Sequence, residues 1–241
     1  MKTIRDASPA ATSSRVESLI MNESQEKILE TQTLLAHIRY ATVGEVCIDN
    51  VHPFHRELFG IEFVFAHNGD VPMFYRSDFN RENLNGNEEK NNMKYEPVGS
   101  TDSERIFCYI LNTLHSKFDA FPPLNELYHE IHQLCSKIVE EEGVILNFLL
   151  GVGEHIFAYS WPGRRPGSKT WNGLYYMFES KDDFSHHDSL TNLGFTIDKA
   201  QVAVIATKPL GNDSSMWIEF KKGELLLFSN GTMSNLLLDC R

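Results

Sequence analysis

The sequence has no hydrophobic run that could cross a membrane and no excess of basic residues. Its 241 residues include 22 Lys and Arg against 33 Asp and Glu, which gives a formal net charge of −11. The longest apolar run, residues 144–152, is interrupted by Asn147 and falls well short of the roughly 18 residues of a membrane helix. The best basic cluster, Arg164, Arg165 and Lys169, is too small for the footprint that nucleic-acid binding requires. We therefore expect neither a membrane nor a nucleic acid as a partner.

Cysteine is also scarce, and the four cysteines that occur are scattered. No two of them form a Cys-x-x-Cys pair, so they predict no disulfide framework. The first residues carry charge but lack the apolar segment of a secretory signal. We therefore expect reduced thiols and a cytoplasmic location. The cysteines are Cys47, Cys108, Cys135 and Cys240.

Helical periodicity occurs in three stretches of the chain. Thr101 and Glu104 have the spacing of a capping box, and the apolar residues that follow predict a helix over 101–117. A second apolar stripe predicts a helix that starts at Pro123 and ends near residue 141. A third pattern predicts a helix over 14–31, so that residues 1–32 form a linker and a helix ahead of the main domain.

Strands are predicted on both sides of the central helices. Alternation of side chains predicts strands over 33–42 and 61–67, the second of them ended by the turn pair Asn68-Gly69. The dipeptide Lys222-Gly223 indicates a hairpin between the last two strands. The later strands are expected over residues 144–150, 155–161, 173–179, 202–207, 216–221 and 224–229.

Strands before and after a pair of helices, joined by hairpins, indicate an α+β fold in which stacked sheets are covered by helices. We assign residues 33–235 to one domain. Within that domain, residues 76–98 are polar and rich in Asn, so we expect an exposed insertion there.

Two further patterns resemble binding motifs only weakly. Residues 163–170, GRRPGSKT, differ from a phosphate-binding loop because Ser168 replaces a glycine and the next element is a strand, so we expect a solvated loop. Four histidines could supply zinc ligands, but Pro53 prevents a helix from presenting two of them on one face. We favour satisfied structural histidines and expect no metal and no cofactor. The histidines are His37, His52, His55 and His67.

Three other features suggest a site for a small charged molecule. Arg39 lies in an otherwise apolar strand, where it either faces inward to bind a carboxylate or lies in water at a sheet edge. Asn68 and Gly69 either form a hairpin turn or present neutral donors to an oxyanion. Asp102 either stabilises a helix N-terminus or binds an ammonium group.

Taken together, the motifs resemble the class II, N-terminal-nucleophile glutamine amidotransferase domain. The resemblance covers about residues 33–230 and is closest to the stand-alone subgroup that includes the bacterial YafJ type and the fungal glutathione-degrading amidotransferase-like subunit. Each motif alone is weak, but their order and spacing make the set specific. The motifs are His37-Ile-Arg39-Tyr-Ala-Thr42, Gly44-Glu45-Val46, His52-Pro-Phe54, Ala66-His-Asn68-Gly69, Ser100-Thr-Asp102-Ser-Glu104, Val204-Ile-Ala-Thr207-Lys-Pro-Leu210 and Trp217.

This resemblance implies a four-layer αββα sandwich of the Ntn-hydrolase type. It implies hydrolysis of the γ-glutamyl amide of glutamine or of a γ-glutamyl peptide through a thioester on an N-terminal Cys. Either water simply releases glutamate from the thioester, or the ammonia also passes to a partner subunit. By resemblance, Arg39 binds the substrate α-carboxylate and Asp102 its α-ammonium, while Asn68 and Gly69 form the oxyanion hole. A cation for a carboxylate and an acid for an amine are the pairings that the residue chemistry also favours.

The N-terminus departs from this family. Family members begin Met-Cys, and the exposed Cys α-amine serves as the general base, whereas this sequence begins Met1-Lys2-Thr3. We therefore expect a form without the nucleophile and the leading hairpin, with an exposed apolar sheet edge and no glutaminase activity. One alternative is a non-catalytic paralogue that binds a glutamine-like ligand or acts as a partner subunit. Another is a metallohydrolase that uses the four histidines.

Overall fold

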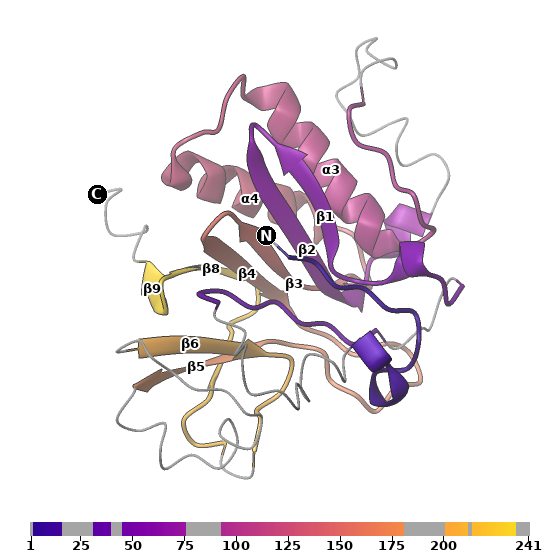
Figure 1. Ribbon diagram of the computed structural model, residues 1–241, viewed down its shortest axis with the longest axis vertical. Coiled ribbons are helices and arrows are strands. Elements are labelled where there is room, and N and C mark those ends of the chain that lie inside the picture. The colour runs from indigo at the N-terminus through magenta and orange to yellow at the C-terminus, as the bar shows by residue number, and fades with distance from the viewer. Residues whose placement is uncertain are drawn as a thin grey trace.

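The computed structural model describes residues 2–15, 31–39, 45–75, 93–180, 201–211 and 214–234. In these ranges the chain forms two antiparallel sheets and two α-helices, α3 (Asp102–Lys117) and α4 (Leu124–Ile138) (Figure 1). The larger sheet has the order β1-β2-β3-β4-β8-β9, and the smaller has the order β6-β5-β7. The strands are β1 Phe54–Leu58, β2 Ile61–Asp70, β3 Ile145–Val152, β4 His155–Trp161, β5 Tyr175–Ser180, β6 Gln201–Ala206, β7 Ile218–Glu219, β8 Glu224–Ser229 and β9 Thr232–Ser234. Three short 3-10 helices complete these elements: η1 Ala10–Thr12, η2 Ile48–Asn50 and η3 Pro72–Tyr75.

The two α-helices cover one face of the larger sheet (Figure 1). Helix α3 begins as its sequence predicts, because the Thr101 hydroxyl accepts a hydrogen bond from the Glu104 backbone N–H at 3.2 Å. The ring of Phe107 then stacks on that of Phe65 in β2, with centroids 5.4 Å apart. Helix α4 is tied to the sheet by the Tyr128 hydroxyl, which donates to the Leu225 carbonyl of β8 at 2.7 Å. Both central helices predicted from the sequence are therefore confirmed.

The smaller sheet packs on the opposite face of the larger one through a second apolar core. Tyr176 and Phe178 of β5 both contact the ring of Phe228 in β8, at centroid distances of 5.9 and 6.2 Å. Side chains alternate between the two faces of a strand, so β8 contributes Leu227 to the helix side and Phe228 to the sheet side. The predicted α+β class, with stacked sheets and helical cover, is confirmed.

The first hairpin of the sheet was not predicted. Strands β1 and β2 pair from Leu58 and Ile61 onward, joined by Phe59 and Gly60, which have φ values of 57° and 77°. A two-residue turn with both φ values positive is the type that suits antiparallel strands, and Asn-Gly is its usual sequence. Phe59 is an unusual residue for this position, so the sequence pattern predicted neither the turn nor β1.

Three details of the strand prediction are wrong: the end of one strand, the assignment of one hairpin and the presence of one strand. Strand β2 does not stop at a turn at Asn68-Gly69 but continues through both residues, which pair with Asn147 and Leu146 of β3. The turn at Lys222-Gly223 exists, but it joins β7 to β8, which lie in different sheets. Within residues 33–39 the chain forms no strand, because a strand requires a paired neighbour and no described segment pairs with this one.

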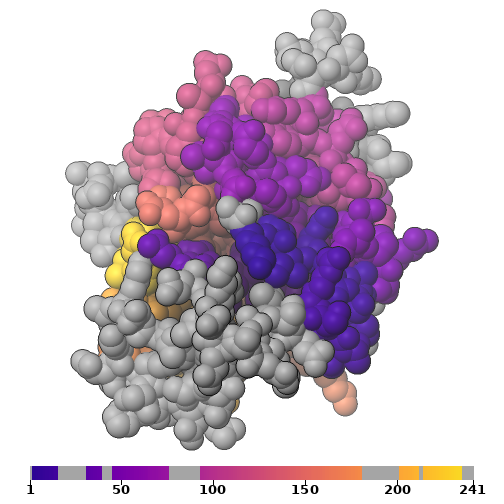
Figure 2. All heavy atoms as spheres, viewed as in Figure 1, coloured from indigo at the N-terminus to yellow at the C-terminus, as the bar shows by residue number. Residues whose placement is uncertain are grey.

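Several expectations fall outside the described residues. They concern most of the helix predicted over 14–31, the end of the strand predicted over 33–42 and most of the insertion predicted over 76–98. Residues 2–15, drawn in indigo, lie on the surface of the face seen in Figure 2. None of the helices within the described ranges is both long and apolar enough to cross a membrane.

Candidate functional site

Arg39 lies at the end of an extended segment with two different faces. Leu35, His37 and Arg39 are half-buried, whereas the residues between them are exposed, and Ile38 has 80% of its surface in contact with solvent. This alternation is the one that the sequence predicts, although the segment is not paired as a strand. The Arg39 guanidinium donates a hydrogen bond to the Glu45 carbonyl at 3.3 Å. Arg39 is thus held by the backbone of the segment that follows.

Asp102 is the first residue of α3 and is buried. One of its carboxylate oxygens accepts a hydrogen bond from the Ser103 backbone N–H at 2.8 Å, as is typical of an acid at a helix N-terminus. The other oxygen accepts from the Val71 N–H at 3.1 Å. Because Val71 directly follows β2, this contact places Asp102 beside the strand end that carries Asn68 and Gly69.

Tyr75 covers the acidic side of this region. Its hydroxyl donates to the Asp70 carboxylate at 3.2 Å. Burial, followed by the negative charges of Asp102 and Asp70, raises the pKa of Tyr75 well above its usual value. Tyr75 therefore remains a neutral hydrogen-bond donor between two carboxylates. No pattern in the sequence indicates this role, because η3 is a single turn with no recognisable motif.

Asn68 and Gly69 occupy the end of β2 that faces β3. Asn147, which is fully buried, donates from its side chain to the Asn68 carbonyl at 3.0 Å and accepts from the Ser160 hydroxyl at 2.8 Å. Within the described part of the chain, the side-chain amide of Asn68 itself makes no hydrogen bond. A Cβ at Gly69 would collide with the Ile145 carbonyl, so this position requires glycine for packing alone. The strand therefore presents a supported backbone and an amide that remains available to a ligand.

The predicted solvated loop over 163–170 is only partly solvated. Arg164 and Lys169 are exposed, but Arg165 is half-buried and its guanidinium donates to the Gly69 carbonyl. This contact brings a second cation to the end of β2. The sequence located the loop but not this contact, because nothing in the pattern links residue 165 to a strand almost a hundred residues earlier.

The histidines divide into a group of three near the start of α3 and a separate half-buried one, His55. The rings of His37 and His52 lie 4.2 Å apart, and His67 binds the Ser103 hydroxyl at 2.9 Å. His55 instead pairs with Glu62 at 3.4 Å on the solvent side of β1. In the described ranges, no three His, Cys, Asp or Glu side chains are grouped so that they could hold a metal ion. The four histidines thus do not converge on one point.

The expectation that the histidines are hydrogen-bonded is wrong for His52. Both of its ring nitrogens are buried, and among the residues that the structure describes neither has a hydrogen-bond partner. Burial, with smaller effects of the neighbouring His37, His67 and Arg39, lowers the pKa of His52 well below its usual value. For the same reasons, with His67 and Arg39 as neighbours, the pKa of His37 falls to about 4. Both rings are therefore neutral at pH 7.

We expect this cluster to make the folded state sensitive to acid. A histidine whose pKa is lowered by folding binds fewer protons in the folded state than in the unfolded chain. Its stabilising contribution is therefore complete above its usual pKa of 6.5 and is lost as the pH falls toward the folded value, which is about 4 for His37. Urea unfolding at a series of pH values should show this loss, and His52→Leu should flatten the dependence because leucine cannot bind a proton. The exposed His129 provides the control, and His52→Leu with the same slope as His129→Leu would contradict the prediction.

Two stacked antiparallel sheets with helical cover match the fold that the sequence motifs suggested. The model of the class-II glutamine amidotransferase family matches residues 1–239, and the chain belongs to this family. A solved structure of a predicted glutamine amidotransferase from Pseudomonas aeruginosa has a TM-score of 0.54 and 24% identity, covering 77% of this chain and 65% of that one. This likeness supports the fold.

Two curated relatives are similar along most of this chain. The "Putative glutamine amidotransferase YafJ" of Escherichia coli is 31% identical over 237 residues, which are 95% of this chain and 80% of that protein. A "Putative glutamine amidotransferase" of Haemophilus influenzae is 31% identical over 207 residues, 84% of this chain and 62% of that protein. The chain thus spans less than two thirds of the Haemophilus protein and of the Pseudomonas structure.

Proposed function

We propose that this domain binds the amino-acid head of glutamine or of a γ-glutamyl peptide and belongs to an amidohydrolase that cleaves the γ-glutamyl amide. The observation that carries the proposal is the series of hydrogen bonds that links Arg39, through the Glu45 carbonyl and the buried Asn50, to Ser100, two residues before Asp102. A guanidinium is suited to a carboxylate, and a carboxylate to an ammonium group. A ligand that satisfies both is an α-amino acid.

The end of β2 supplies the groups that act on the amide itself. In hydrolysis of an amide, the carbonyl oxygen gains negative charge, and neutral donors aimed at it lower the barrier. The Asn68 amide is available for this role, and its backbone is held by Asn147. The thiol that attacks the carbonyl and the α-amine that moves its proton would come from an N-terminal Cys, whereas the first residues of this chain are Met1-Lys2-Thr3.

The test compares two polypeptides. One consists of residues 1–241, and the other carries an in-frame upstream segment that begins Met-Cys. We propose that the first binds glutamine without releasing glutamate, while the second releases it, because covalent catalysis requires both the thiol and the α-amine. Robust release by the first polypeptide, abolished by Cys47→Ser, would overturn this proposal and assign the nucleophile to Cys47.

Arg39→Ala should weaken glutamine binding by about 10- to 100-fold, because a hydrogen bond to a charged group contributes about 1.5–3 kcal/mol. In the active form, this loss should raise KM more than it lowers kcat, since the α-carboxylate is held equally in the ground and transition states. Titration followed by NMR measures the affinity. Arg164→Ala is the matched control, because Arg164 is an exposed arginine. If the Arg39 variant and the unchanged protein bound glutamine with equal affinity, Arg39 would not be a ligand-binding residue.

We further propose a cytoplasmic location and a partner subunit. In support of the first, Cys47, Cys108 and Cys135 are free thiols, and burial raises the pKa of Cys108 to about 12. In support of the second, Ile38 and Val46 expose most of their apolar surface beside the site. A non-catalytic paralogue that binds glutamine is the alternative function, and it would be favoured if the extended polypeptide bound glutamine but remained inactive.

A further inference from the structure

Asn50 occupies a buried position between the two segments that carry Arg39 and Asp102. It ends the single turn η2, and only 1% of its surface is exposed. Neither of these segments is part of a sheet in the described residues, so strand pairing does not fix the distance between them. Helix packing and the Val71 contact hold Asp102, and the side-chain contacts of Asn50 relate it to the backbone that holds Arg39.

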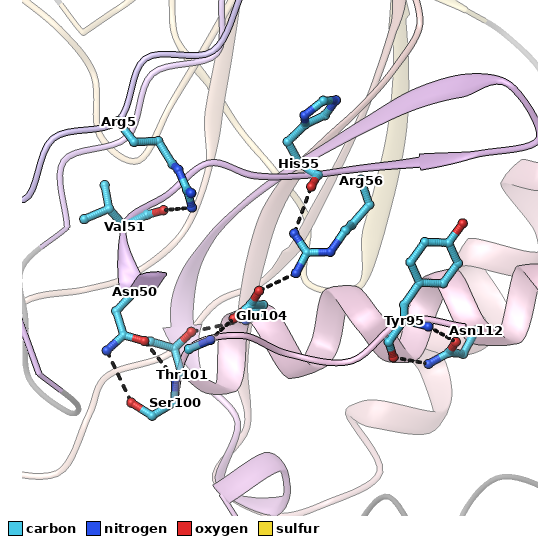
Figure 3. A network of polar contacts seen from close by, with 11 residues as sticks. Arg5, Asn50, Val51, His55, Arg56, Tyr95, Ser100, Thr101, Glu104 and Asn112 are labelled. Carbon is cyan, nitrogen blue, oxygen red and sulfur yellow. Dashed lines mark hydrogen bonds and ion pairs between the residues drawn. The ribbon is translucent and has the colours of Figure 1, made fainter. Parts of the chain in front are cut away.

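The side-chain amide of Asn50 uses its oxygen and its nitrogen at the same time (Figure 3). Its oxygen accepts a hydrogen bond from the Ser100 backbone N–H at 2.8 Å. Its nitrogen donates to the Ser100 hydroxyl at 3.2 Å and to the Glu45 carbonyl at 2.9 Å. An amide nitrogen has two hydrogens, so both of its donors are engaged. Asn50 thus joins the Glu45 backbone to the residue two places before Asp102.

The Glu45 carbonyl is the same atom that holds Arg39. It accepts from the Arg39 guanidinium at 3.3 Å and from Asn50 at 2.9 Å. A continuous series of hydrogen bonds therefore links the Arg39 guanidinium, through Glu45, Asn50 and Ser100, to the start of α3. A substitution at Asn50 is therefore expected to change the positions of both charged side chains, Arg39 and Asp102, although Asn50 contacts neither of them.

The loop around Gly99, which lies next to Asn50, is held tightly in place. A Cβ at Gly99 would collide with the Asn50 side-chain oxygen and the Asp49 carbonyl, so the two chain segments approach as closely as glycine allows. The Gly99 N–H donates to the Glu104 carboxylate at 2.6 Å, which fixes the loop to the first turn of α3. Asn50 therefore binds a loop that cannot shift to follow it.

We infer that Asn50 is a positioning residue that sets the separation between the carboxylate-binding Arg39 and the ammonium-binding Asp102. This inference rests on the proposed function. A ligand with both groups gains affinity when its second contact forms at high effective concentration, and this gain requires a fixed distance between the two partners. Asn50 supplies that fixed distance, so it determines the preference for an intact α-amino acid over molecules that have one of the two groups.

Three ligands separate this role from a general loss of stability. L-Glutamine carries both groups, glutaramic acid lacks the α-ammonium, and 4-aminobutanamide lacks the α-carboxylate. Asn50→Ala should lower the affinity for L-glutamine about tenfold or more, while the affinities for the two analogues change less than about twofold. NMR titration of the folded protein, well below its unfolding temperature, measures all three dissociation constants.

A second variant keeps the test valid if alanine prevents folding. Asn50→Asp retains an oxygen for the Ser100 N–H but removes both donated hydrogen bonds, to the Glu45 carbonyl and to the Ser100 hydroxyl. The Ser100 hydroxyl can turn and donate to the new carboxylate, so only the contact with Glu45 on the Arg39 side is lost without replacement. This variant should show the same selective loss for L-glutamine. Asn112→Ala is the matched control, because Asn112 also binds a neighbouring backbone through both side-chain atoms, at Tyr95, on the other side of Figure 3. It should lower stability without changing the ligand preference.

The outcomes are distinguishable. If the unchanged protein shows no preference for L-glutamine over both analogues, the proposed function fails, and the role of Asn50 fails with it. If the unchanged protein has the preference and both Asn50 variants retain it, only the positioning role is overturned. The same selective loss in Asn112→Ala would also overturn it, since the effect would then follow from destabilisation.

Discussion

In a catalytically competent form of the protein, Asn68→Ala should lower kcat about 100- to 1,000-fold with little change in KM, the loss expected for one oxyanion donor. The ground-state carbonyl carries less charge than the oxyanion, so the Asn68 amide contributes mainly in the transition state. Its backbone should stay in place, because Asn147 binds the Asn68 carbonyl and not the side chain that is removed. Steady-state kinetics of glutamate release provides the measurement.

The opposite response of Arg39→Ala makes this prediction specific. Loss of Arg39 should act mainly on KM and loss of Asn68 mainly on kcat. Asn68→Asp is a stricter test, since it keeps the shape of the side chain but places negative charge where the oxyanion forms. A kcat for Asn68→Ala within about threefold of the unchanged enzyme would be too small for an oxyanion donor and would assign this role elsewhere.

Glu104→Ala should lower the free energy of unfolding by about 3 kcal/mol, near the lower end of the range for breaking a buried ion pair. The Glu104 side chain is 2% exposed, binds the Arg56 guanidinium at 2.6 Å and also accepts from the Gly99 N–H. Removing it leaves two donors without their acceptor. Arg56 keeps 24% of its side-chain surface exposed, so water can partly replace the lost partner. Urea unfolding measures the change.

A double-mutant cycle separates the pair from its surroundings. Arg56→Met should cost at least as much as Glu104→Ala, because it leaves the buried Glu104 carboxylate without its cation. The double variant should cost less than the sum of the two, because it leaves no buried charge unpaired. Glu62→Ala is the control, since Glu62 is an exposed acid on the neighbouring strand that pairs with a histidine. Surface pairs contribute little, so a loss at Glu62 as large as that at Glu104 would contradict the burial argument.

The elements with strong local patterns could be predicted from the sequence. Helix α3 has a cap at Thr101 and a continuous apolar stripe, and both determine its start and its buried face without help from the rest of the chain. The burial pattern around Arg39 was predicted for the same reason. Strand pairing could not be predicted there. The alternation of side chains indicates which face is buried, but it does not indicate whether a partner strand is present.

The sequence singles out the charged residues of the proposed site, but not the residues that hold them. Arg39 is conspicuous because a charge in an apolar segment requires a partner, and Asp102 because it lies at a predicted helix start. Asn50 and Asn147 are ordinary polar residues in sequence, and their function depends on backbone atoms that come close only after folding. Gly69 was identified as a turn residue or an oxyanion donor, whereas the structure requires a glycine there for lack of space beside Ile145.

The position of β8 has a consequence for how the protein is made. This strand pairs with β4, but the whole smaller sheet lies between them in the chain. Its side chains enter both cores, so neither layer is complete until residues near the C-terminus have left the ribosome. During synthesis the edge of β4 is open while β5, β6 and β7 are already available to pair with it. Until β8 has been synthesised, β4 therefore has an unpaired edge, of the kind that favours wrong strand pairing.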